Sequence, residues 1–153
     1  YKRQQQVDLQ LSYSYTDARY RGQAVLFGET INPGDRVALV PLHRLYGRLA
    51  VRPLEGLELS LDGTYVGRQV LINNETTKTP FRIQDYFVLN AQASYRWKAL
   101  TAFVQGFNLT DAKYETYGIY AFDPRTFTDA VFLMPAPGIN FLAGLRVQFK
   151  DYY

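Results

Sequence analysis

The sequence predicts an all-β fold of about six antiparallel strands and no helix. Three observations support this prediction: apolar and polar residues alternate with a period of two, long and short connections follow one another regularly, and tyrosine and tryptophan gather near the ends of the alternating runs. A period of two places successive side chains on opposite faces of a strand, whereas a helical pattern repeats every ~3.6 residues. The six runs, in chain order, are 7–15, 45–52, 57–65, 87–96, 100–109 and 141–149.

The positions of apolar and polar residues support a strand in each run. In run 7–15, valine, leucine and tyrosine occupy the odd positions, and aspartate, glutamine and serine occupy the even ones. Runs 45–52 and 57–65 carry leucines at odd positions, against arginines in the former and acidic or hydroxyl residues in the latter. Runs 87–96 and 141–149 follow the same rule, while the fifth run is apolar on both faces near its start, so its orientation stays open. The clean runs each predict a strand with one apolar and one polar face.

The connections between these runs alternate in length. Long stretches near 21–42, 71–82 and 115–138, each containing proline, alternate with tight turns at 53–56 and 97–99. Because antiparallel strands run in alternating directions, all the long connections fall at one end of the sheet and all the short turns at the other. Outer-membrane barrels have this arrangement.

Alternation alone leaves two interpretations open. In a small soluble β-barrel or sandwich the apolar face points inward, and in a transmembrane barrel it points outward to lipid. The segregated loops and the run lengths, close to the roughly nine to eleven residues of a tilted membrane-spanning strand, favour the transmembrane barrel. Aromatic residues near the strand ends favour it too, because such residues form girdles at the lipid interface. These residues are Tyr13, Tyr15, Tyr65, Tyr95 and Trp97.

The polar face of the predicted sheet is strongly charged. A single arginine at the midplane of a bilayer would cost about 2–4 kcal/mol, so these charges require a wet lumen or another part of the protein. The smallest single-chain barrels use about eight strands and are filled by side chains, so six strands predict an arc of a larger barrel. The residues predicted to face the lumen are Arg44, Arg48, Arg52, Glu58, Asp62 and Arg96.

Composition and motifs argue against an enzyme. The 17 basic and 14 acidic residues of the 153-residue chain give a net charge of +3, too small to indicate a nucleic-acid partner, and the absence of cysteine excludes thiolate metal sites and cysteine nucleophiles. Glu58 and Asp62 share a strand face but would lie roughly 13 Å apart, too far for an acid–base pair. His43 has no neighbouring ligands and is expected to be a polar residue facing the pore or the membrane interface. We therefore expect no catalytic residue, no metal site and no cofactor.

Two motifs in the last third of the chain resemble the C-terminal end of TonB-dependent outer-membrane receptors. The stretch Asn-Leu-Thr-Asp at 108–111, followed by Tyr114, is similar to the family's Asn-Leu-Phe-Asp-x-x-Tyr. The stretch Pro-Ala-Pro-Gly-Ile-Asn-Phe at 135–141 is similar to the family's Pro-Gly-Arg plus aromatic entry to the last strand, with Ile139 where arginine is usual.

The last run also resembles this family. Gly144, Val147 and Phe149 match the Gly-x-x-apolar-x-aromatic signal that directs barrel assembly, although the family usually ends at that aromatic and four residues follow it here. The resemblance implies that residues 1–153 are the C-terminal portion of a barrel of about 22 strands, a single partial domain without the plug.

The resemblance also implies a function and a set of partners. The intact protein would be an active transporter and receptor in the bacterial outer membrane, taking up a scarce nutrient with energy coupled through TonB. An iron–siderophore is the first expectation for this nutrient and cobalamin the second. The implied partners are membrane lipid and lipopolysaccharide, the upstream plug and remaining strands, the TonB complex through the N-terminal part, and a small metal chelate. Nucleic acid is not among them.

The third long connection is the richest in candidate ligand contacts. Aromatic rings with a few charges suit a flat, partly apolar chelate, and an arginine there would suit an anionic group. The alternative is that these side chains pack the loop onto itself or against lipopolysaccharide. A small soluble barrel or sandwich that binds a ligand or partner, and a small membrane barrel closed by oligomerisation, stay as alternatives for the whole chain. The candidate contacts are Tyr117, Tyr120, Phe122, Arg125 and Phe127.

Overall fold

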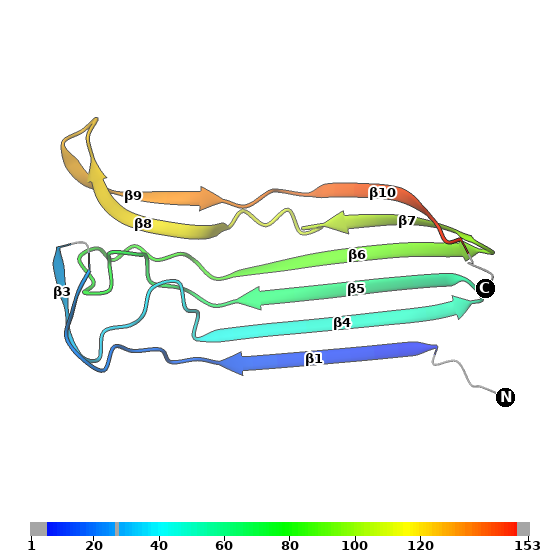
Figure 1. Ribbon diagram of the computed structural model, residues 1–153, viewed down its shortest axis with the longest axis horizontal. Helices are drawn as coiled ribbons and strands as arrows, with labels where there is room; N and C mark the ends of the chain where they lie inside the picture. The colour runs from blue at the N-terminus through cyan, green and yellow to red at the C-terminus, as the bar shows by residue number, and fades with distance from the viewer. Residues whose placement is uncertain (1–5, 27, 150–153) are drawn as a thin grey trace.

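The described part of the chain forms one open antiparallel sheet with two small hairpins at one end. The computed structural model describes residues 6–26 and 28–149, and these residues contain ten strands. The strand order of the main sheet is β1-β4-β5-β6-β7-β10, and every neighbouring pair is antiparallel (Figure 1). Its strands are β1 (Val7–Tyr15), β4 (His43–Leu54), β5 (Leu57–Val66), β6 (Tyr86–Trp97), β7 (Leu100–Phe107) and β10 (Asn140–Val147).

The all-β prediction is confirmed, and each of the six alternating runs forms a strand of the main sheet. Two predicted runs are too long at their C-terminal ends. The fifth stops at Phe107 because Asn108 adopts a positive φ of 50°, which breaks the extended backbone. The sixth stops at Val147, which pairs with the first residue of β7, so Phe149 lies beyond the strand. The four residues after Phe149 lie outside the described part of the chain.

Two hairpins were not predicted. They consist of β2 (Ala24–Leu26) with β3 (Glu29–Ile31), and of β8 (Glu115–Asp123) with β9 (Thr128–Pro135). Run 117–121 of β8 is Tyr-Gly-Ile-Tyr-Ala, which has no polar position on either face, so the period-two signal is missing there. The third long connection is therefore mostly hairpin, not irregular loop.

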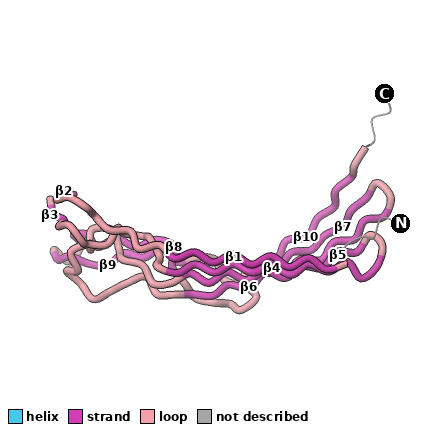
Figure 2. Tube along the Cα trace, turned by 90° about the horizontal axis from the view of Figure 1, so that it is seen from below, coloured by secondary structure: helices cyan, strands magenta, loops and turns pink. Residues whose placement is uncertain are grey.

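The long and short connections are segregated as predicted. Tight turns join β4 to β5 and β6 to β7, and positive φ angles at Gly56 (83°) and Lys98 (55°) allow those turns. The long connections and both hairpins lie together at the opposite end of the sheet (Figure 1). Seen from the side, the main sheet is a thin, curved single layer (Figure 2).

The register places apolar residues in continuous rows on one face of the sheet, here called the apolar face. One row crosses all six strands, and its two leucines nearest the β1 edge, Leu9 and Leu49, are 67% and 43% exposed. Leu11 and Leu145 on this face are each 71% exposed. The sheet neither closes on itself nor packs against a second sheet, so the soluble barrel or sandwich does not describe this chain. The row consists of Leu9, Leu49, Leu61, Ala91, Gly106 and Phe141.

The largest fully buried apolar side chains lie among the long connections. We call residues 16–42, 67–85 and 108–139 the first, second and third loops, and together the loop cap. Ile31 from the first loop and Leu71 and Ile83 from the second are at most 1% exposed. Gly118 of β8 packs against this core so closely that an added Cβ would overlap Leu71 Cδ2. The loop cap therefore has its own small core at the end of the sheet.

Candidate functional site

The face opposite the apolar face carries a hydrogen-bonded polar network, and we call it the polar face. Arg52 Nε donates to Glu58 Oε2 at 2.9 Å, and Arg48 Nη2 lies 3.6 Å from the same carboxylate. Asn90 Nδ2 donates to Asp62 Oδ2 at 2.8 Å. Glu58 therefore binds the two arginines and Asp62 binds Asn90, so the two carboxylates form no acid–base pair.

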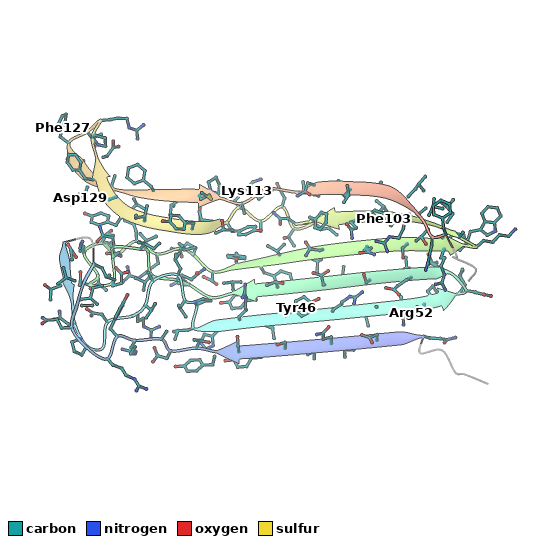
Figure 3. All side chains as sticks on the ribbon, viewed as in Figure 1. Tyr46, Arg52, Phe103, Lys113, Phe127 and Asp129 are labelled. Carbon is teal, nitrogen blue, oxygen red and sulfur yellow. The ribbon has the colours of Figure 1, made fainter. Side chains whose placement is uncertain are left out.

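The register places all six residues predicted to face a lumen on this polar face. Arg48 pairs with Asp62, Glu58 pairs with Ser94, and Arg96 continues the same side of β6. The register also settles the orientation of β7, which the alternation left open: Phe103 pairs with Ser94 and lies on the polar face. Figure 3 shows where Tyr46, Arg52 and Phe103 lie along their strands. That the polar face borders a lumen stays a prediction.

Aromatic residues mark both ends of the apolar face. Near the loop cap, the Tyr13 hydroxyl and His43 Nδ1 are hydrogen-bonded at 2.9 Å, and the Tyr15 ring centroid lies 5.3 Å from that of His43. At the turn end, Lys98 Nζ lies 5.0 Å from the centre of the Trp97 ring. His43 is therefore on the apolar face near a strand end, and its interfacial role stays a prediction.

Asn108 organises the junction between β7 and the third loop. It is 3% exposed, and its Nδ2 donates to the carbonyls of Ala112 (3.0 Å) and Pro137 (3.2 Å) while its Oδ1 accepts from the Ala112 N–H (2.9 Å). Asp111 Oδ1 accepts from the Ile139 N–H at 3.1 Å. These bonds tie both predicted motifs, 108–111 and 135–141, into one structural unit next to the start of β10.

The three residues of the predicted assembly signal occupy different environments. Gly144 lies on the polar face under the Phe103 ring, where an added Cβ would approach Phe103 Cζ within 2.6 Å. Val147 is the last residue of β10 on the apolar face, and Phe149 follows the strand and is 85% exposed. An exposed aromatic at this position fits contact with lipid.

A junction around Lys78 joins all three loops of the cap. Lys78 in the second loop forms an ion pair with Glu29 of β3, in the first loop. Its Nζ lies 5.8 Å from the centre of the Tyr120 ring of β8, in the third loop. Asn73 adds a hydrogen bond of 2.8 Å to the Tyr120 carbonyl, and Thr76 Oγ1 donates to Glu29. We call these five residues the Lys78 junction.

The structure does not bring the five predicted ligand contacts together. Tyr117 and Tyr120 lie at positions of opposite parity on β8, and Tyr120 belongs to the Lys78 junction. Phe122 and Phe127 contact each other near the tip of the hairpin, with ring centroids 6.2 Å apart. Figure 3 shows Phe127 and Asp129 at that tip, away from the main sheet.

Arg125, the fifth predicted contact, is already engaged. Its Nη2 lies 3.1 Å from Asp123 Oδ2, and its backbone N–H donates to Asp123 Oδ1 at 2.9 Å. The hydrogen bonds from Arg125 hold the pKa of the Asp123 carboxyl below its usual range. Ligand contact by these five residues stays a prediction.

The structure also contains a cleft of about 420 Å³ between the first and second loops, which no sequence pattern predicted. The first loop forms one wall with Gly34, Asp35, Arg36, Val40 and Leu42. The second loop forms the other with Arg68, Gln69, Val70, Glu75, Thr77 and Arg82. These side chains come from irregular segments, and no spacing rule for strands or helices relates them. The abundance of charge in 67–85 was the only available signal.

Two further properties concern metals and helices. Among residues 6–26 and 28–149, no three histidine or acidic side chains cluster so that they could hold a metal ion. The same residues contain no helix long and apolar enough to cross a membrane.

These features define the class of fold. An antiparallel sheet with an uncovered apolar face, a hydrogen-bonded polar face and all long loops at one end is an arc of an outer-membrane-type β-barrel. The family described as "TonB dependent receptor-like, beta-barrel" matches residues 2–109, more than half of the sequence. The chain belongs to the TonB-dependent receptor β-barrel family.

Solved structures share this fold at low sequence identity. The ferric yersiniabactin uptake receptor FyuA from Yersinia pestis matches with a TM-score of 0.74 and 17% identity, over 98% of this chain and 22% of that chain. The siderophore receptor PiuA from Acinetobacter baumannii matches with a TM-score of 0.72 and 15% identity, over 93% and 19%. The ferric enterobactin receptor PfeA from Pseudomonas aeruginosa, a mutant in complex with enterobactin, matches with a TM-score of 0.69 and 16% identity, over 97% and 21%. The chain thus spans about a fifth of the length of these structures, and no curated protein matches it.

Proposed function

We propose that residues 1–153 are the C-terminal arc of a larger barrel in the bacterial outer membrane. The two outer strands, β1 and β10, each have a partner on one side only. In a bilayer every backbone N–H and C=O must be paired, so both edges require further strands. The assembly signal at Gly144, Val147 and Phe149 supports a position at the end of the barrel, with the plug and the remaining strands upstream.

The two faces of the sheet then have different surroundings. The apolar face contacts membrane lipid and, near the loop cap, lipopolysaccharide, and the aromatic residues at its two ends lie at the two interfaces. The polar face lines the lumen, where Arg44, Arg96 and the Glu58 and Asp62 networks meet water and the plug. The closed-oligomer alternative has the same lipid contact but lacks a plug.

The intact protein takes up a scarce nutrient with energy supplied through TonB. The observation that carries this proposal is the arrangement of the sheet: one uncovered apolar face, one networked polar face, and a packed loop cap at a single end. An iron–siderophore is the first candidate because the structural neighbours include siderophore receptors, and cobalamin is the second. The family consists of receptors rather than enzymes, and we propose no catalytic role or cofactor for this chain.

The mass of the native protein tests the first part of the proposal. An antibody raised to the 123–129 hairpin tip would detect the protein in isolated outer membranes. We expect a mass several times 17.6 kDa, since the arc needs the other strands. A mass near 17.6 kDa would refute the large receptor and leave the oligomeric barrel.

Transport is then measured with the intact receptor in cells. We expect uptake of a radioactive ferric siderophore that stops when TonB is deleted or the membrane is de-energised. Uptake that continues unchanged without TonB would contradict the coupling.

A further inference from the structure

The cleft between the first and second loops has the size of a small-molecule binding site. Its volume of about 420 Å³ lies within the range of roughly 300–1,000 Å³ found for small-molecule pockets. Val40, Leu42 and Val70 give it apolar lining, while Gln69 and Thr77 add polar groups. Such a combination of apolar surface with a few polar groups is typical of ligand pockets.

Glu75 gives this cleft a buried acceptor. The residue is 7% exposed, yet its carboxylate has no hydrogen bond or ion pair to any residue that the structure describes. Every fully enclosed side-chain oxygen in that part of the chain has a partner, so the oxygens of Glu75 are open to the cleft. Burial raises the pKa of Tyr20, and the negative charge of Glu75 raises it further to a smaller extent. A carboxylate this deeply buried calls for a donor.

Arg82 gives the cleft a free donor. Its Nη1 donates to the carbonyls of Thr79 (2.9 Å) and Phe81 (2.7 Å), which fixes the half-buried guanidinium in place. A guanidinium has about five N–H donors. Those of Nε and Nη2 have no partner among the residues described, and no nitrogen of Arg82 lies within ion-pair distance of Glu75. One small cleft thus presents a pre-positioned cation and a separate buried anion.

The other two arginines of the cleft are already paired with carboxylates. Arg36 lies 3.7 Å from Asp17, and Arg68 lies 3.2 Å from Asp85. Hydrogen bonds from Arg68 hold the pKa of Asp85 below its ordinary value. Arg82 is therefore the guanidinium best able to accept a new anion.

We propose that this cleft binds one arm of a small chelating molecule, an arm that carries both an anionic oxygen and an ammonium or N–H donor. Arg82 binds the anionic oxygen and Glu75 accepts from the donor. The inference rests on the proposed function, because it assigns the transported molecule a second chemical requirement besides its metal. It also places recognition between the first two loops, and not at the tip of the β8–β9 hairpin.

The test uses the intact receptor in detergent and a trihydroxamate chelator, one arm of which carries both a carboxylate and an ammonium group. Two derivatives, one amidated at the carboxylate and one acetylated at the amine, each lack one of the two charges. Binding of the ferric and metal-free forms is measured by quenching of intrinsic fluorescence. We expect either modification to weaken binding to the natural protein by about tenfold to a hundredfold, as for the loss of a charged hydrogen bond.

Variants assign each charged group of that arm to the residue that binds it. Arg82→Gln should lose the discrimination against amidation but keep the discrimination against acetylation, and Glu75→Gln should show the reverse. Lys113→Gln is the matched control, since this lysine pairs with Asp111 in the third loop and does not line the cleft, and it should discriminate like the natural protein. A folding defect would weaken all probes equally and so would not reproduce this crossed pattern.

The outcomes separate the two proposals. Equal binding of all three chelators by the natural protein, or discrimination that survives in both cleft variants, would overturn the cleft assignment alone. Crossed discrimination with the metal-free chelators but no uptake of any ferric form would support the cleft and refute iron transport.

Discussion

Replacing Asn108 by alanine should loosen the third loop more than any other single polar-to-alanine change in that loop. The side chain makes four hydrogen bonds, three of them to main-chain groups of Ala112 and Pro137. Each bond contributes about 1 kcal/mol net, and more where a buried partner is left unpaired. Alanine at a φ of 50° adds about 1 kcal/mol of backbone strain, since asparagine tolerates this region better. The three bonds to the main chain and the backbone strain together total about 4 kcal/mol, because the hydroxyl of the exposed Thr110 bonds to water in the variant.

Hydrogen–deuterium exchange of the intact receptor measures this loss locally. In Asn108→Ala, peptides covering 108–114 and 136–140 should exchange about a hundredfold to a thousandfold faster, because each 1.4 kcal/mol is roughly a factor of ten. Peptides from β4 and β5 should not change. Asn108→Gly should recover part of the loss, about tenfold, because glycine adopts a positive φ without strain.

The matched control is Asn140→Ala. Asn140 is exposed and makes one side-chain bond of 3.0 Å, to the Gly138 carbonyl. In Asn140→Ala, the peptides covering 108–114 and 136–140 should exchange no more than about twofold faster, as for surface substitutions generally. Equal effects of Asn108→Ala and Asn140→Ala would refute the assignment of the junction to Asn108.

Three further predictions concern the apolar face, the cap and the junction. Leu11→Arg should lower the free energy of unfolding in lipid vesicles, measured by urea titration, by about 2–4 kcal/mol. The control Gln10→Arg, on the polar face, should change it by less than about 0.5 kcal/mol. Equal losses in the two variants would contradict the assigned faces. Gly118→Val should cost the loop cap about 1–3 kcal/mol through overpacking and speed its proteolysis on intact cells, and unchanged cleavage would argue against a packed cap. The hydrogen bond from Lys113 holds the pKa of Asp111 below its ordinary value of 3.8, so this carboxylate stabilises the folded junction above that pH and the contribution is lost as the pH falls through the lowered pKa. Hydrogen–deuterium exchange at 136–140 should accelerate in that acidic range, and Asp111→Asn should remove this pH dependence. The same pH profile in the natural protein and in Asp111→Asn would contradict the role of the Asp111 carboxylate.

The main sheet was predictable because each of its strands meets two contrasting environments. The alternation of apolar and polar residues reflects that contrast directly. The exception was β7, where Phe103 lies on the polar face because its ring covers Gly144 of the neighbouring strand. An aromatic ring that fills the space over a glycine of the adjacent strand gives no periodic signal within its own run.

The loop cap was not predictable by the same means. The second loop contains positive φ angles at Asn73 and Thr77, and its backbone bonds reach β8 across a large sequence separation, as in the 3.0 Å bond from the Ile72 N–H to the Gly118 carbonyl. Contacts of this kind depend on which segments the sheet brings to one end. The five aromatic and basic residues proposed as ligand contacts were chosen by composition, and composition does not distinguish an exposed tip from a junction residue such as Tyr120.

The Lys78 junction bears on how such receptors acquire new specificities. Because Glu29, Lys78 and Tyr120 come from three different loops and meet at one point, none of these loops is an independent module. A loop exchanged alone between relatives would leave a lysine without its carboxylate or a ring without its cation. A stable exchange between relatives should therefore replace the three loops together.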